Sequence, residues 1–304
     1  MGLVKEAQKS MKFEEFVFFS KKNGIHSLEF PIDYFCKIEN KKLDYYFKIL
    51  ASNQINTIID LEDLNFTTLK KLADISKEFK FNIIRVKMSN FFGGNRYLIK
   101  NFYKIKHKFI NDLKKSIKII DKTDLRFAIE NHQDLNSKEL VDILRNTSIT
   151  KVGINWDIAN SLATIETPDE FFNTTKNYIL NVHSKDYKVI DSNNGFFLKR
   201  CVIGTGIVKF KNYIDFFKKN KINFSIELGA HISRHCDFKN NKFIRSHNLS
   251  KKRIRKFEKF LDKEKVDENP YTNWELNKNL KQAYVEEIND VKASIKFVKK
   301  IYEK

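Results

Sequence analysis

The stretch Phe127-Ala128-Ile129-Glu130-Asn131-His132 is an apolar, strand-forming run that ends in polar residues. Three later stretches have the same form: Gly153-Ile154-Asn155-Trp156-Asp157, Asn181-Val182-His183-Ser184-Lys185-Asp186 and Phe224-Ser225-Ile226-Glu227-Leu228-Gly229. A βα unit of an eight-stranded barrel takes about 30 residues, which is close to the spacing between the first three stretches. We therefore expect these stretches to end at the carboxyl ends of consecutive parallel strands, where such barrels carry their active sites.

Strand-forming and amphipathic segments alternate along the rest of the chain, which favours a parallel sheet with helices outside it. The expected strands are residues 2–7, 25–30, 56–61, 82–87, 126–131, 152–157, 180–185 and 224–228. The expected helices are residues 12–22, 42–53, 67–79, 99–120, 137–145, 168–178 and 210–219. Eight strands favour closure of the sheet, so the predicted fold class is α/β, a single (β/α)8 TIM barrel.

We expect one domain over residues 1–304, because no linker separates two parts of the chain. Residues 1–229 should supply the barrel strands, and residues 230–304 a C-terminal helical extension. That extension is expected to be irregular up to residue 275 and to end in a closing helix over 280–302. Residues 187–209 are expected to form a long loop over the active site.

The chain has a formal net charge of +19, which makes nucleic acid or an anionic surface a candidate partner. No block of five like charges occurs, so a solvated coat of lysines is the simpler interpretation and nucleic acid an unlikely partner. Three cysteines without a CxxC pair indicate a reduced, cytoplasmic protein. No signal peptide or apolar run of 18 residues is found, which predicts a soluble protein with no membrane partner. A homo-oligomer stays open.

The acidic and histidine residues of the four stretches predict a metal site. They are Glu130, Asp157, His183 and Glu227. Three carboxylates and one imidazole suit one divalent ion such as Mn²⁺, Mg²⁺ or Co²⁺ better than a structural zinc ion, which prefers cysteine and histidine.

These motifs, taken in order, resemble the xylose isomerase-like TIM barrel family, which includes sugar-phosphate isomerases and epimerases. The resemblance rests on Ile-Glu-Asn-His at 129–132, Asn-Trp-Asp-Ile-Ala-Asn at 155–160, His-Ser-Lys-Asp at 183–186, Gly-Thr-Gly at 204–206 and Ser-Ile-Glu-Leu-Gly at 225–229. It implies a (β/α)8 barrel with one divalent metal held by the four residues above. It also implies proton transfer next to a sugar carbonyl, in an isomerase or epimerase of carbohydrate metabolism whose substrate is a small carbohydrate or sugar acid.

The expected chemistry assigns roles to several side chains. A metal chelated by the carbonyl and its neighbouring hydroxyl would stabilise an enediolate, and the reaction needs a base and an acid on opposite faces. Glu130 and Glu227 are the predicted pair. Lys185 is expected to stabilise an oxyanion. His132 is expected either to orient substrate or to make a supporting hydrogen bond.

Further residues are predicted to contact the substrate. Arg85 and Glu29 resemble substrate-contacting positions of the family, and Arg234, just after the last strand, could bind a carboxylate or phosphate. Gly204-Thr205-Gly206 could form an anion-binding nest, although a plain turn is the simpler interpretation. Asn160 stands where many epimerases and nucleases of this fold have histidine, so a mechanism that uses histidine there is doubtful.

Three other functions compete with a sugar isomerase or epimerase. The nearest is decarboxylation of a 3-oxo sugar acid on the same metal site. An apurinic-site endonuclease would need further histidines, which the strand ends around Asp60 and Lys87 lack. A binding protein on a degenerate barrel is disfavoured because all four ligands are present.

Overall fold

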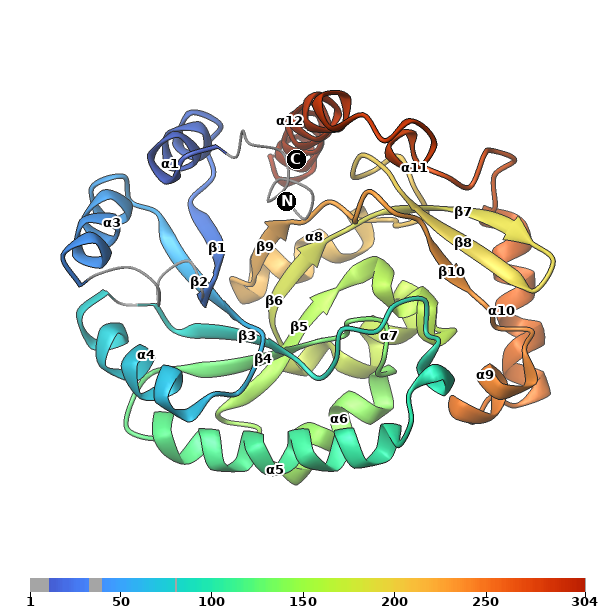
Figure 1. The fold of residues 1–304 in the computed structure, drawn as a ribbon, viewed down its shortest axis with the longest axis horizontal. Helices are drawn as coiled ribbons and strands as arrows, with labels where there is room; N and C mark the ends of the chain where they lie inside the picture. The colour runs from blue at the N-terminus through green and yellow to red at the C-terminus, as the bar shows by residue number, and fades with distance from the viewer. Residues whose placement is uncertain (1–10, 33–39, 80, 304) are drawn as a thin grey trace.

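The computed structural model describes residues 11–32, 40–79 and 81–303. Seven parallel strands form its main sheet, in the order β1-β2-β3-β4-β5-β6-β9. Their bounds are β1 Ser27–Pro31, β2 Asn56–Leu61, β3 Ile83–Lys87, β4 Arg126–Glu130, β5 Val152–Asp157, β6 Ile179–Ser184 and β9 Asn223–Ile226. The two outer strands, β1 and β9, contact each other, so the sheet curls into a nearly closed barrel (Figure 1). The prediction of a TIM barrel is confirmed.

Helices surround the barrel (Figure 1). They are α1 Phe13–Lys22, α3 Asn40–Ser52, α4 Phe66–Phe79, α5 Phe102–Ile120, α6 Ser137–Asn146, α7 Pro168–Thr175, α8 Lys211–Asn220 and α12 Leu280–Tyr302. Local sequence sets some of their starts. Asn136 and Glu139 form a capping box before α6, and Thr167 and Glu170 form another before α7, whose first residue is Pro168.

The alternation of side chains along each strand decides which ones face the barrel interior. Trp156 in β5 is fully buried and points outward, where its ring packs against Phe171 and Phe172 of α7 and Tyr213 of α8. Its neighbour Asp157 must then point inward. The apolar residues that hold the helices on the barrel thus also fix the direction of the acidic side chain at the strand end.

Residues 187–209 do not form a single long loop, so that prediction is wrong. They contain β7 Tyr187–Ser192 and β8 Gly195–Arg200, which pair with each other in antiparallel fashion. Strand-forming residues lie on both sides of Asn193-Asn194, a pattern typical of a hairpin. β10 Arg234–Cys236 adds a third strand beside β8.

The C-terminal extension is more regular than expected up to residue 275. It contains β10, α9 Asn241–Ser246, α10 Lys251–Glu264 and α11 Asn273–Asn277. With the β7–β8 hairpin, α9 and α10 form a layer on one side of the barrel, at the right of Figure 1. The closing helix is present as α12. The expected strand over residues 2–7 lies outside the described residues.

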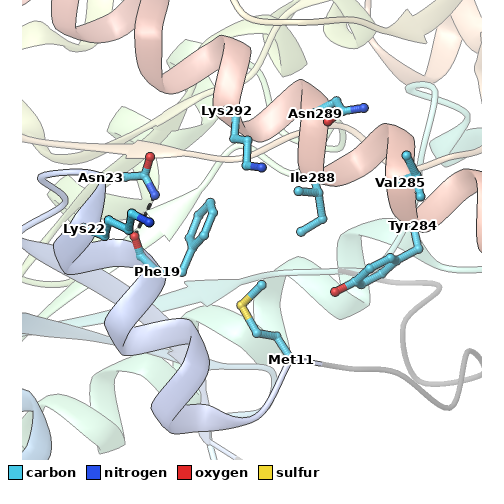
Figure 2. Close-up of a pocket in the computed structure, with 9 residues that line it drawn as sticks. All are labelled: Met11, Phe19, Lys22, Asn23, Tyr284, Val285, Ile288, Asn289 and Lys292. Carbon is cyan, nitrogen blue, oxygen red and sulfur yellow. Dashed lines mark hydrogen bonds between the residues drawn. The ribbon is translucent and has the colours of Figure 1, made fainter.

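The helices at the two ends of the chain enclose a groove. α1 and α12 lie side by side, and the space between them has a volume of about 520 Å³ (Figure 2). None of the predicted site residues lines it. Across the part of the chain that is described, every helix is too short or too polar to cross a bilayer.

Candidate metal centre

Four residues from four strand ends meet inside the barrel. Glu130 ends β4, Asp157 ends β5, His183 lies in β6 and Glu227 directly follows β9. One potential ligand atom from each lies within 4.8 Å of the other three. The first three side chains are almost fully buried, whereas 37% of the Glu227 side chain is exposed. The cluster could therefore bind a metal ion and is open to solvent on the Glu227 side.

The donor atoms of the cluster suit such an ion. Asp157 Oδ1 is buried and makes no hydrogen bond. Glu130 Oε2 faces the Arg85 guanidinium, and His183 Nδ1 contacts Glu227 Oε2. Buried polar atoms nearly always have a hydrogen-bond partner, so the unpaired Asp157 oxygen, beside three further ligand atoms within 4.8 Å, fits a bound cation. Hard oxygens with one imidazole nitrogen are the donor set of Mn²⁺, Mg²⁺ or Co²⁺.

Burial and neighbouring cations set the charges in the cluster. Burial raises the pKa of Asp157 to about 7, in spite of the nearby Lys185 ammonium. Burial also acts to raise the pKa of Glu130, but Arg85 and His132 outweigh it and bring the pKa down to about 2. Desolvation works against the charged form of His183, yet Glu29 and Glu227 hold its pKa well above its usual value. The chain's own cations thus hold Glu130 ionised, whereas burial favours the protonated form of Asp157.

Arg85 organises the carboxylates of three strands. Its guanidinium pairs with Glu29 at 3.0 Å, Asp60 at 2.9 Å and Glu130 at 3.1 Å. Glu29 also forms a hydrogen bond with His183: Glu29 Oε2 lies 2.8 Å from His183 Nε2. Such bonds orient the Glu130 carboxylate and the His183 ring. Substrate contacts of Arg85 and Glu29 stay predictions.

Lys185 and His132 lie beside the cluster. Lys185 Nζ contacts Asp157 Oδ2 and lies 3.0 Å from Glu227 Oε1. The His132 ring packs on Phe92 at 5.0 Å between centroids, and its buried Nδ1 makes no hydrogen bond. Burial lowers the pKa of His132 to about 4. The imidazole is therefore neutral near pH 7.

Amide side chains fix Asp157, and the sequence analysis singled out Asn160 but not Asn131 or Gln133. Asn131 donates from Nδ2 to the Asp157 carbonyl at 2.8 Å and accepts the Asp157 N–H at 2.7 Å. Asn160 donates to Asp157 Oδ2 at 2.5 Å, and Gln133 donates to Asn160 Oδ1 at 2.8 Å. Asn160 thus holds the carboxylate at the position where many relatives have histidine. Asp60 was also missed, although it ends an apolar strand in the way Glu130 does.

The Gly204–Gly206 turn binds a carboxylate of its own chain. The backbone N–H groups of Gly204, Gly206 and Val208 donate to Asp186 at 2.9, 2.9 and 3.1 Å. Asp186 lies two residues after the end of β6, so the turn fastens the segment after the hairpin to the strand that carries His183. Arg234 lies with its guanidinium over the ring of Phe92, and that ring in turn packs on His132.

Comparisons with known sequences agree with this architecture. The model of the family described as "Xylose isomerase-like TIM barrel" matches residues 60–235, more than half of the chain. YihM of Escherichia coli is 33% identical over 87 residues, which are 29% of this chain and 27% of that protein. The 3-oxo-isoapionate decarboxylase of Pectobacterium atrosepticum is 21% identical over 104 residues, 34% of this chain and 38% of the enzyme. The matches thus span well under half the length of these curated relatives.

Solved structures share the fold at low identity. The probable 3-DHS dehydratase AsbF of Bacillus anthracis has a TM-score of 0.59 at 14% identity, covering 81% of this chain and 96% of that one. D-psicose 3-epimerase of Clostridium cellulolyticum, solved with D-tagatose, has a TM-score of 0.59 at 12% identity, covering 83% and 92%. A Mycobacterium smegmatis protein solved with magnesium has a TM-score of 0.59 at 11% identity, covering 82% and 89%. The chain belongs to the xylose isomerase-like TIM barrel family.

Proposed function

We propose that this protein is a divalent-metal-dependent isomerase or epimerase that acts on a sugar or sugar acid. The observation that carries the proposal is the convergence of four ligand atoms within 4.8 Å at the barrel mouth, beside a buried lysine. Structures of this family solved with D-tagatose and with magnesium support a carbohydrate substrate and a hard cation. A reducing compartment, the cytoplasm, fits the free thiols of Cys201 and Cys236.

Each residue of the cluster has a place in this chemistry. A divalent ion held by Glu130, Asp157, His183 and Glu227 would supply a Lewis acid that polarises the substrate carbonyl and its neighbouring hydroxyl. Glu130 and Glu227 are kept ionised, the first by Arg85 and the second by Lys185 and His183. One carboxylate would take the proton next to the carbonyl, and the other, once protonated from solvent, would deliver a proton to the opposite face.

The neighbouring residues would bind and orient the substrate. Lys185 places a positive charge beside Asp157 and Glu227, where negative charge would grow on the carbonyl oxygen. His132 is neutral near pH 7 and would accept or donate a hydrogen bond to a hydroxyl. Arg85 and Glu29 would hold the ligands in place and border the substrate.

Hydrogen exchange tests the proposal even while the product is unidentified. Mn²⁺-loaded protein is offered a panel of ketoses and sugar acids in D₂O, and deuterium is sought next to the carbonyl. We expect deuterium incorporation for one substrate class. In Glu227→Gln the rate of incorporation should fall by about 10²-fold or more, the usual size of a lost acid–base contribution. Asp237→Asn, outside the cluster, is the matched control. Wild-type exchange in Glu227→Gln with metal still bound would make Glu227 a ligand only.

Decarboxylation of a 3-oxo sugar acid is the second candidate, favoured by the similarity to 3-oxo-isoapionate decarboxylase. The same ion and Lys185 could stabilise the negative charge left when carbon dioxide departs. Release of carbon dioxide from a 3-oxo acid in the panel, at a rate above that of reversible deuterium exchange, would place decarboxylation first.

A further inference from the structure

Arg234 is a partly buried cation without a counter-charge. It lies in β10, and its guanidinium carbon is 3.7 Å from the centroid of the Phe92 ring. The residue is partly buried, and this burial lowers the pKa of the guanidinium. Among the residues that the structure describes, no carboxylate lies within ion-pair distance of it. Removing a guanidinium from water without an anion is unfavourable, so the position favours an anion from outside the chain.

The charged and titratable groups that face Arg234 do not supply that anion. Glu275 acts on it only at a distance, because its Oε2 already accepts the N–H groups of Ser233 at 3.0 Å and Thr272 at 2.8 Å. Tyr187 also faces Arg234, but burial raises the pKa of its phenol, which stays neutral. The guanidinium therefore keeps its donors available.

The loop that carries the exposed Phe92 is held in place from two sides. The next residue, Gly93, donates its N–H to Gln133 Oε1 at 2.6 Å, and Asn95 donates to the carbonyl of His235 at 2.9 Å. Gly93 has a φ of +65°, and a Cβ there would come within 2.2 Å of that same carbonyl. The loop after β3 is thus fastened both to the end of β4 and to β10, and Phe92 and Arg234 keep a fixed relation to each other.

The pair borders the same mouth as the metal cluster. Phe92 packs on His132, two residues after Glu130. Gln133, which anchors the Phe92 loop, bonds Asn160, and Asn160 bonds Asp157. A substrate whose carbonyl end is held by the cluster would therefore extend toward Arg234.

We propose that Arg234, lying on Phe92, is an anion subsite that selects substrates with a carboxylate at the end remote from the carbonyl. The inference rests on the proposed function and narrows its substrate class from sugars in general to sugar acids. One planar guanidinium matches the planar, singly charged carboxylate by paired hydrogen bonds. A guanidinium also pairs with phosphate, but a phosphate monoester carries nearly two negative charges, of which one guanidinium neutralises only one.

Three probes with the same carbonyl end test the subsite: D-fructose, D-fructuronate with a carboxylate at C6, and D-fructose 6-phosphate. Their dissociation constants are measured by calorimetry with full-length, Mn²⁺-loaded protein at low ionic strength. We expect D-fructuronate to bind about tenfold or more tightly than D-fructose, the size of one charge-assisted pair. Arg234→Gln should abolish this preference and leave D-fructose unchanged. Arg234→Lys should keep part of the preference, and exposed Arg245→Gln should keep all of it.

Several results would overturn the proposal. The subsite is wrong if wild-type protein binds D-fructuronate no better than D-fructose, or if folded Arg234→Gln keeps the preference. If only D-fructose 6-phosphate binds more tightly than D-fructose, and Arg234→Gln removes that difference, the subsite binds phosphate and the carboxylate assignment is overturned. Thermal unfolding confirms that each variant is folded. Failure of the proposed function is separate, because that would appear as absent deuterium exchange in wild-type protein with metal bound.

Discussion

At the scale of single residues, the cluster depends on two cations from other positions: Arg85 pairs with Glu130, and Lys185 pairs with Asp157 and Glu227. Glu130, Asp157, His183 and Glu227 each lie at or next to the end of an apolar strand, so their positions could be predicted from the sequence, whereas their partners could not. Asp60 ends a strand in the same way, but its role depends on Arg85, which reaches three strands at once. Asn131 and Gln133 bond backbone or amide groups, and such contacts depend on loop geometry that no residue pattern predicts. The assigned roles in metal and substrate binding stay predictions.

Lys185→Met separates charge stabilisation from metal binding. Lys185 is buried against Asp157 and Glu227, where it would stabilise a growing negative charge, so its loss should slow deuterium exchange by about 10²-fold. Metal binding should persist, because removing a nearby positive charge favours a cation on the same carboxylates. Elemental analysis and exchange rates check both parts, with Lys188→Met as control. If Lys185→Met does not bind metal, Lys185 is needed to position the metal ligands, and its role in charge stabilisation is not separated from metal binding.

At the scale of elements, the parallel strands and most helices followed from periodicity, whereas the hairpin did not. Val189, Phe196 and Leu198 are buried on one face of β7 and β8, so the alternation was present in the sequence. It was missed because a barrel of consecutive βα units predicts a connection there. β10 pairs only three residues with β8, and so short a strand is defined by its partner more than by its own sequence.

His247 links α9 to the loop after β3 and makes stability depend on pH. It is buried, its Nε2 donates to the Gly94 carbonyl at 2.6 Å, and burial lowers its pKa to about 3. In the unfolded chain the imidazole binds a proton near pH 6.5, whereas in the folded protein it stays neutral down to about pH 3. The contribution of His247 to the unfolding free energy is therefore fully present above about pH 6.5 and is lost as the pH falls toward 3. The slope is up to about 1.4 kcal/mol per pH unit.

Urea unfolding of wild type and His247→Gln at pH 7.5, 6, 5 and 4 measures that contribution, because the unfolding free energy extrapolates linearly to zero denaturant. Wild type should lose its advantage over the variant as the pH falls. A difference in unfolding free energy that stays constant from pH 7.5 to 4 would show that His247 does not carry the effect.

At the scale of the whole molecule, one continuous core supports the proposal of a single domain. Buried residues of the barrel, such as Ile129 and Trp156, belong to the same apolar cluster as Phe196 in the hairpin and Phe257 in α10. The sequence could not predict that the layer shares its core with the barrel, because the layer is assembled from segments before and after β9.

The positive charge is also a property of the whole molecule. A formal charge of +19 from a dispersed lysine coat should give weak binding to an abasic DNA duplex, lost at moderate salt, and no incision. Gel-shift and nicking assays at salt concentrations from about 50 to about 300 mM test this expectation. Electrostatic binding to DNA weakens steeply over that range. Metal-dependent nicking that vanishes in Glu227→Gln would favour a nuclease.

The central claim is a single metal centre at the barrel mouth, and metal stoichiometry tests it most directly. Protein reconstituted with Mn²⁺ and freed of excess ion is measured by elemental analysis, beside Asp157→Asn, His183→Ala and the exposed control Asp191→Asn. We expect one ion per chain in wild type and control, and loss of most of the affinity in the two cluster variants. No stoichiometric ion in folded wild-type protein, or three ions per chain, would contradict the account.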